Sequence, residues 1–333
     1  MTALLLAHLV VGLGLVVGGE RVGRRGVLMA AAPPAATVVW LAFRAGGALG
    51  GRPVTEDVAW VPQLGLDVSL RLDGFAVLFV ALVSGIGVLI LLYSGRYLAA
   101  GGAGQGRLLG LLVLFSGSML GLVLADNLIV LFGFWELTSI TSFLLIGIDH
   151  ESVKARAAAL QALLVTGMGG LAMLAGFVLI GQAVEGGGSY QLSQVVADPP
   201  SGPPVTVGIV LVLVGALTKS AQYPFHSWLP GAMVAPTPVS AYLHSATMVK
   251  AGVYLIGRFA PAFADVWVWR PLVVTVGLVT MVAGGLRALR QHDLKLILAF
   301  GTVSQLGFMV VMFGLGTAET IVDACELVLA HAL

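Results

Sequence analysis

The chain has too few charged residues to cover a water-facing surface. Only 10% of its 333 residues are charged, 58% are hydrophobic, and the mean hydropathy is +1.01. A soluble domain carries roughly 25% charged residues and about 45–50% apolar ones. The sequence therefore predicts an integral membrane protein.

The low net charge and the single cysteine each exclude a class of function. The net charge is only +1, from 17 Lys and Arg against 16 Asp and Glu, which provides no basic field for nucleic acid. The single cysteine, Cys325, makes neither an intrachain disulfide nor a CxxC motif, and no clustered metal ligands stand out. We therefore expect no nucleic-acid partner, no cofactor, no metal and no redox chemistry in this chain.

Long apolar stretches predict an all-α, polytopic membrane protein. A helix needs about 20 apolar residues to cross a bilayer. Ten such stretches and the start of an eleventh are separated by charged or Gly/Pro-rich joints: 3–18, 27–43, 74–94, 108–125, 127–147, 157–182, 205–222 continuing brokenly to 241, 242–258, 271–286, 296–315, and 319 onward. The chain stops at Leu333 inside apolar sequence, so we expect a fragment cut within a helix.

The long loop at 44–73 contains the pattern of a strand. Between Leu66 and Leu72, apolar residues alternate with polar ones, which is the period of a half-buried strand. This pattern predicts a small extracellular hairpin. We accordingly divide the chain into an amino-terminal part, residues 1–73, with two spans and this loop, and a main membrane domain, residues 74–333.

The distribution of positive charge predicts the orientation. One alternating set of joints holds ten Lys and Arg, including Arg287 and Lys295, whereas the other set holds five, including Arg258. Lys and Arg concentrate in cytoplasmic joints. We therefore expect a cell-membrane protein whose amino terminus lies outside. Only Lys219 and Lys250 fall within spans.

Ionisable residues inside spans carry the functional information. Such a residue costs about 2.5–3.5 kcal/mol at a helix centre, so it usually faces a partner, a cavity or an ion path. Glu136 lies mid-span with Ser139 on the same helical face. The alternative is a structural carboxylate satisfied by hydroxyls. Lys219 ends an apolar run, where the alternative is a lysine that snorkels to the interface.

A proline-rich segment directly follows Lys219 and weakens the snorkelling alternative. Four prolines recur over 15 positions of apolar sequence: Pro224, Pro230, Pro236 and Pro238. Because Pro224 cannot donate to the carbonyl of Ser220 and crowds that turn, the helix must break just beyond Lys219. Breaks at membrane depth line polar cavities and mark ion sites in transporters. We expect a discontinuous helix near 220–238.

After Lys219 the sequence carries two histidines, His226 and His244, and a second lysine, Lys250. A membrane histidine often only packs, but its ordinary pKa of about 6.5 also suits proton relay. His244 shares a face with Thr247, whereas Lys250 is turned about 120° from His244 in an ideal helix. A common path therefore needs helix distortion or bridging water. We rank His244 above Lys250, and both above His226.

The last two spans add two candidates. Lys295 begins one span, with Thr302 on nearly the same face, and snorkelling is an equally good interpretation from spacing alone. His331 lies in apolar sequence near the end. A glutamate and a lysine that stabilise each other's charge form a switch, because Lys219 gives up its proton more readily once Glu136 moves away or is neutralised.

Long motifs in this sequence carry a family resemblance. They are Phe134–Gly147, Leu217–Pro230, Pro236–Gly252 and Asp293–Gly307. Together they resemble the proton-conducting membrane subunits shared by multisubunit Na⁺/H⁺ antiporters and respiratory complex I, from about residue 66 to the end. Within that superfamily, Gln161–Gly176 is most similar to the A-type subunits of Mrp-type (Mnh-type) antiporters.

The resemblance implies roles for the ionisable residues. Glu136 and Lys219 match the coupling pair, His244 the adjacent relay, and Lys295 and His331 the central proton path. With Lys250, these residues form our candidate proton pathway. The resemblance also implies an antiporter-like bundle of about fourteen helices with pseudo-symmetric repeats, of which this chain is the front part.

The resemblance favours a transporter component over an enzyme. The expected function is a membrane subunit of a Na⁺/H⁺ antiporter, with other membrane subunits as partners and Na⁺ and H⁺ as transported ions. One alternative is a proton-pumping membrane subunit of complex I or of a membrane-bound hydrogenase. Another is a non-conducting scaffold, which leaves the intramembrane charges unexplained.

Overall fold

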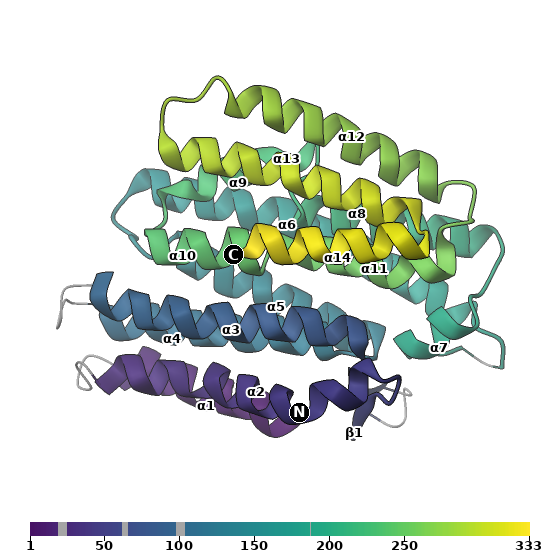
Figure 1. Cartoon of the computed structure of the whole chain (residues 1–333), viewed down its shortest axis with the longest axis horizontal. Helices are drawn as coiled ribbons and strands as arrows, with labels where there is room; N and C mark the ends of the chain where they lie inside the picture. The colour runs from purple at the N-terminus through teal and green to yellow at the C-terminus, as the bar shows by residue number, and fades with distance from the viewer. Residues whose placement is uncertain (19–24, 62–65, 98–103, 187) are drawn as a thin grey trace.

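The protein is a bundle of membrane helices, seen from one side in Figure 1. The structure is a computed structural model that describes residues 1–18, 25–61, 66–97, 104–186 and 188–333. The helices are α1 (Thr2–Gly18), α2 (Arg25–Leu49), α3 (Gly74–Tyr97), α4 (Gln105–Leu124), α5 (Leu128–Ile146), α6 (Val153–Gln182), α7 (Leu192–Ala197), α8 (Pro203–Lys219), α9 (Trp228–Gly231), α10 (Thr237–Ala241), α11 (Lys250–Phe263), α12 (Trp269–Ala288), α13 (Leu294–Leu315) and α14 (Ala318–Ala332). The predicted all-α class is confirmed.

Many of these helices are long and apolar enough to cross a membrane. Within the described residues, α2 to α6, α12 and α13 meet both conditions, while α1 and α8 are apolar but shorter. Together they make a multi-pass membrane protein. In Figure 1, α1 and α2 lie at one edge and α12 with α13 at the other.

The predicted span 242–258 is wrong as a single helix. The chain forms α10, continues as a π-helix, η5 (Tyr242–Ala246), and leaves helical geometry at Thr247 before α11 starts at Lys250. The reason is local competition: the Thr247 hydroxyl donates to the Tyr242 carbonyl oxygen at 2.5 Å, five residues earlier. A hydroxyl that occupies a backbone acceptor in this way disturbs the regular ladder.

The predicted hairpin is present between α2 and α3. Strands β1 (Val54–Val61) and β2 (Leu66–Leu72) pair antiparallel. Leu70 and Leu72 are buried, as expected for the apolar side of a period-2 strand. The hairpin lies at the end of the bundle where α7 also lies (Figure 1).

Three connecting segments meet at that end. The Asp126 amide, between α4 and α5, donates to the Ser69 carbonyl oxygen in β2 at 2.8 Å, and the Leu192 amide donates to the Asp126 carbonyl oxygen at 2.8 Å. These contacts place the two joints on the same side as the hairpin, in agreement with the alternation of predicted spans. The expected cytoplasmic joint at 20–26 lies largely outside the described residues.

Helices α8 and α11 cross with their backbones in close contact. A Cβ atom at Gly252 in α11 would overlap the Ala216 carbonyl oxygen and the Ser220 hydroxyl oxygen. Only glycine permits this approach, since no side-chain movement can relieve a clash with backbone. The crossing therefore fixes the end of α8 against the start of α11.

Replacing Gly252 by alanine tests this crossing. We expect Gly252→Ala to lower the unfolding free energy by about 1–3 kcal/mol through overpacking, measured by thermal unfolding of the detergent-solubilised protein. Gly85→Ala in α3 is the matched control, because a Cβ there meets nothing within 4 Å. Equal melting temperatures for the two variants would contradict the close crossing.

Candidate functional site

Lys219 is fully buried at the end of α8 and reaches across to α5. Its Nζ donates to the Trp135 carbonyl oxygen at 2.7 Å and to the Ser139 hydroxyl oxygen at 2.8 Å. It also lies 4.7 Å from the centroid of the Trp135 ring, where the π face attracts a cation. The side chain therefore does not snorkel, because its charged end points into the bundle.

Helix α8 ends at Lys219, and the carbonyl groups freed there find new partners. Ala221 has a positive φ of 49°, which turns the chain out of the helix. The Gln222 amide then donates to the Leu217 carbonyl oxygen at 2.9 Å, and the Trp228 indole donates to the Thr218 carbonyl oxygen at 3.0 Å. Satisfied carbonyls allow a helix to stop inside the membrane.

The break after α8 continues through short helical pieces. They are η3 (Phe225–Ser227), α9 and η4 (Ala232–Val234), and α10 begins only at Thr237. The predicted discontinuous helix near 220–238 is thus confirmed.

The break after α8 touches the second break, between η5 and α11. The Ser220 hydroxyl donates to the Val249 carbonyl oxygen at 2.6 Å. Lys219 and Lys250 therefore flank the contact between the two breaks. The helix distortion that a path from His244 to Lys250 requires is present as η5 and the irregular turn after it.

Lys250 is also fully buried and is held by the last helix. Its Nζ donates to the Val328 carbonyl oxygen of α14 at 2.8 Å. His331 follows Val328 by three residues, so the same face of α14 carries both the acceptor and the histidine.

Glu136 lies beside Lys219 without touching it. The carboxylate is half-buried on α5, and its Oε1 atom is buried with no hydrogen-bond partner. Lys219 instead binds residues 135 and 139 of α5, on either side of Glu136 along the sequence. Among the described residues no salt bridge within 4.0 Å joins the two charges. The alternative of a carboxylate satisfied by hydroxyls does not describe this arrangement.

A cavity of about 560 Å³ joins three of the predicted residues. His244, Lys295 and His331 line it, from η5, α13 and α14. Both ring nitrogens of His244 are buried and without a hydrogen-bond partner. The cavity is large enough for several water molecules. Its other polar lining residues are Thr237, Ser240, Ser245, Thr302 and Gln305.

Lys295 connects this cavity to the first break. Its Nζ donates to the carbonyl oxygens of Met233 at 3.1 Å and Ala235 at 2.8 Å, at the end of η4. Thr302 lines the same cavity, as the shared helical face predicts. The structure therefore places the Lys295 ammonium on the broken segment.

His226 is separate from the cavity. The guanidinium of Arg287 in α12 donates to His226 Nε2 at 3.0 Å, and the imidazole stacks on Tyr223 with ring centroids 5.5 Å apart. The structure thus gives His226 its own partners within the break.

Two family models match this chain. The family described as "NADH:quinone oxidoreductase/Mrp antiporter, TM" matches residues 125–333, and "NADH-Ubiquinone oxidoreductase (complex I), chain 5 N-terminus" matches residues 60–107. The chain belongs to the NADH:quinone oxidoreductase/Mrp antiporter family. The resemblance predicted from the motifs is confirmed.

Two curated relatives of this chain are named as antiporter subunits. A probable K⁺/H⁺ antiporter A/B subunit of Rhizobium meliloti is 52% identical over 278 residues, which are 83% of this chain and 27% of that protein. The Na⁺/H⁺ antiporter A1 subunit of Staphylococcus haemolyticus is 47% identical over 271 residues, 81% of this chain and 33% of the relative. The chain thus spans about a third or less of their length.

Solved structures share the fold. The Mrp complex from a Dietzia species matches with a TM-score of 0.90 and 41% identity, over 99% of this chain and 36% of that one. An archaeal membrane-bound sulfane sulfur reductase matches with a TM-score of 0.87 at 23% identity, over 99% and 68% of the two chains, which shows the fold alone.

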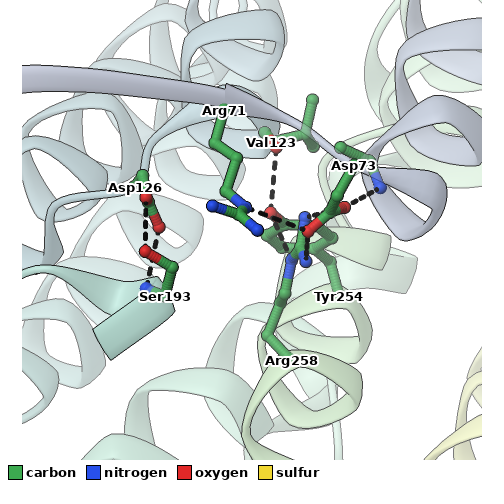
Figure 2. Close-up of polar contacts among 8 residues, drawn as sticks. Arg71, Asp73, Val123, Asp126, Ser193, Tyr254 and Arg258 are labelled. Carbon is green, nitrogen blue, oxygen red and sulfur yellow. Dashed lines mark hydrogen bonds and ion pairs between the residues drawn. The ribbon is translucent and has the colours of Figure 1, made fainter. Parts of the chain in front are cut away.

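This antiporter-family chain has a second polar cluster that the sequence did not reveal (Figure 2). Arg258 of α11 binds Asp73, at the start of α3, through two hydrogen bonds of 2.5 and 2.8 Å. Arg258 also donates to the Tyr254 hydroxyl at 2.9 Å, which donates to the Val123 carbonyl oxygen at 2.9 Å. Arg258, counted with a joint in the charge distribution, lies within α11 at the hairpin end of the bundle, where Asp73 compensates its charge.

The same cluster joins further segments at the hairpin end. Asp126 accepts hydrogen bonds from the Ser193 amide at 2.8 Å and the Ser193 hydroxyl at 2.7 Å. Arg71 in β2 lies 3.8 Å from Asp73. These side chains line a cavity of about 300 Å³ (Figure 2). Asp73 and Arg258 are 185 residues apart, so no local pattern signals their contact.

The Asp73 carboxylate holds its charge through Arg258. Burial opposes the charged form, but the hydrogen bonds and positive charge of Arg258 outweigh burial, and the pKa of Asp73 is lowered. Because the folded pKa lies below the ordinary value of about 3.9, the contact stabilises the fold above that value. This stability is lost as pH falls through the folded pKa.

Asp73→Asn therefore destabilises the protein at neutral pH. We expect a loss of about 1.5–3 kcal/mol, the value of hydrogen bonds to charged groups, and a smaller loss of stability on acidification than in the wild type. Asp265→Asn is the control, because its pair with Arg270 is exposed. Thermal unfolding across acidic pH measures both, and identical curves for the two variants would sink the assignment.

Proposed function

We propose that this chain is the proton-conducting front part of the A-type subunit of a multisubunit Mrp-type cation/proton antiporter, with Na⁺ as the exchanged cation. One observation carries the proposal: two fully buried lysines flank two helix breaks in contact, beside a cavity that holds two histidines and a third lysine. Charges at membrane depth occur where ions or protons pass.

The proposed pathway begins at Glu136 and Lys219. The Lys219 ammonium rests on α5 and gives up its proton when Glu136 moves away or becomes neutral, because the carboxylate no longer stabilises the positive charge. Trp228 lies between this site and the cavity: its indole binds the Thr218 carbonyl oxygen, and its ring centroid is 6.0 Å from that of His244. Water in the cavity then connects His244 to the remaining groups.

Lys250, Lys295 and His331 continue the proposed pathway. Lys250 and Lys295 each donate to a backbone carbonyl oxygen, Lys250 to Val328 within α14 and Lys295 to Ala235 after η4. Within the described part of the chain, neither lysine is paired with a carboxylate. Among the described residues that line the cavity with His331, none is acidic. The pathway beyond Lys219 therefore consists of basic groups linked by water.

Relatives support the antiporter over the complex I or hydrogenase alternative. The names of the two curated relatives both describe antiporter subunits, one for Na⁺ and one for K⁺. We infer that other membrane subunits of the antiporter assemble with this chain in the cell membrane. The amino terminus and the hairpin lie outside in this proposal, as the Lys and Arg distribution indicates. Residues 1–73 and 74–333 form the two parts proposed from the sequence.

Substitution of the buried pair tests the proposed function. In the full-length subunit within its complex, Glu136→Gln and Lys219→Met each reduce Na⁺-driven proton movement in membrane vesicles to background, because the switch loses one charge. Exposed residues in the α5–α6 joint and in the first turn of α6 provide matched controls, Glu151→Gln and Lys154→Met, which retain transport. Normal transport by both pair variants, with assembly intact, rules the proposal out.

A further inference from the structure

Two adjacent glycines of α6 lie where α5 and α8 approach it. A Cβ atom at Gly169 would overlap the Thr218 hydroxyl oxygen in α8. A Cβ atom at Gly170 would overlap Oε1 of Glu136 in α5, and would lie 3.2 Å from Glu136 Cδ and 3.4 Å from Trp135 Cδ1. The glycine pair therefore contacts the Glu136 side chain directly and, through Thr218, the last turn of α8, which ends at Lys219.

Packing, and not hydrogen bonding, sets the position of the Glu136 carboxylate. Its Oε1 atom is buried and has no hydrogen-bond partner, so no donor fixes it. The atom instead occupies the space above the Gly170 α-carbon. In an α-helix, glycine is disfavoured relative to alanine, and at position 170 the overlap that a Cβ atom would make with Glu136 provides a packing reason for it.

We propose that Gly170 is a positioning residue, which leaves room for the Glu136 carboxylate to lie between α5 and α6 beside Lys219. A methyl group at position 170 pushes the carboxylate out of this space and away from its place next to the lysine. The inference rests on the proposed function, in which Glu136 acts on Lys219. Gly170 itself touches no transported ion.

A second glycine of the same helix supplies the comparison. Gly167 lies one turn before Gly170, and a Cβ atom there meets nothing within 4 Å. Gly167→Ala and Gly170→Ala make the same chemical change in the same helix, and both raise helix propensity. They differ in what the new methyl group meets.

The experiment measures Na⁺-driven proton movement by the assembled complex with full-length subunit variants. Gly170→Ala is expected to reduce transport roughly tenfold or more, because a small misplacement of a reacting group has a large effect on rate. Gly167→Ala is expected to transport like the wild type. Shortening the carboxylate makes room for the methyl group, so Gly170→Ala with Glu136→Asp should transport faster than Gly170→Ala alone.

The outcomes separate this inference from the proposed function. If Glu136→Gln abolishes transport while Gly170→Ala matches Gly167→Ala, Gly170 does not position the carboxylate. If Glu136→Gln transports normally, the proposed function fails first. If Gly170→Ala does not assemble, the double variant decides: assembly with transport at the level of Glu136→Asp alone supports the inference, and failure to reach either one overturns it.

Discussion

The ammonium of Lys219 on the backbone of α5 is the interaction on which the rest of the site depends. A buried positive charge is costly unless hydrogen bonds replace its water. The Trp135 carbonyl, the Ser139 hydroxyl and the indole face supply that replacement. Because none of them carries a full charge, the lysine is held without being locked to a carboxylate. A nearby carboxylate can therefore still change how readily Lys219 loses a proton.

Helix breaks make this interaction possible and are themselves stabilised by it. Helix α8 stops at Lys219. The carbonyl groups freed at its end accept hydrogen bonds from residues within the break. The second break meets the first through Ser220. Helix α11 is then fixed at both ends, by Lys250 on α14 and by Arg258 on Asp73. Irregular backbone is tolerated at this depth because protein groups satisfy it.

Local chemistry in the sequence predicted the parts of the fold that depend on neighbouring residues. Pro224 predicts the first break, because its ring and missing N–H act on the turn in which it stands. The π-helix before Thr247 was missed, since it depends on which acceptor a hydroxyl chooses in the packed structure. The contact of Arg258 with Asp73 was missed because the two residues are distant in sequence. Gly170 gave no signal, as its neighbour comes from another helix.

The most direct test of the account is a double-mutant cycle between Glu136→Asp and Ser139→Ala, read as the rate of proton transport by the assembled complex. Both changes keep the lysine: one alters the carboxylate near it, and the other removes the hydroxyl that its Nζ binds. The account predicts that the two losses are not independent, with a coupling energy of about 0.5–3 kcal/mol, as for residues that share a network. Losses that simply multiply would show that Glu136 and the Lys219 anchor work separately, and would contradict the account.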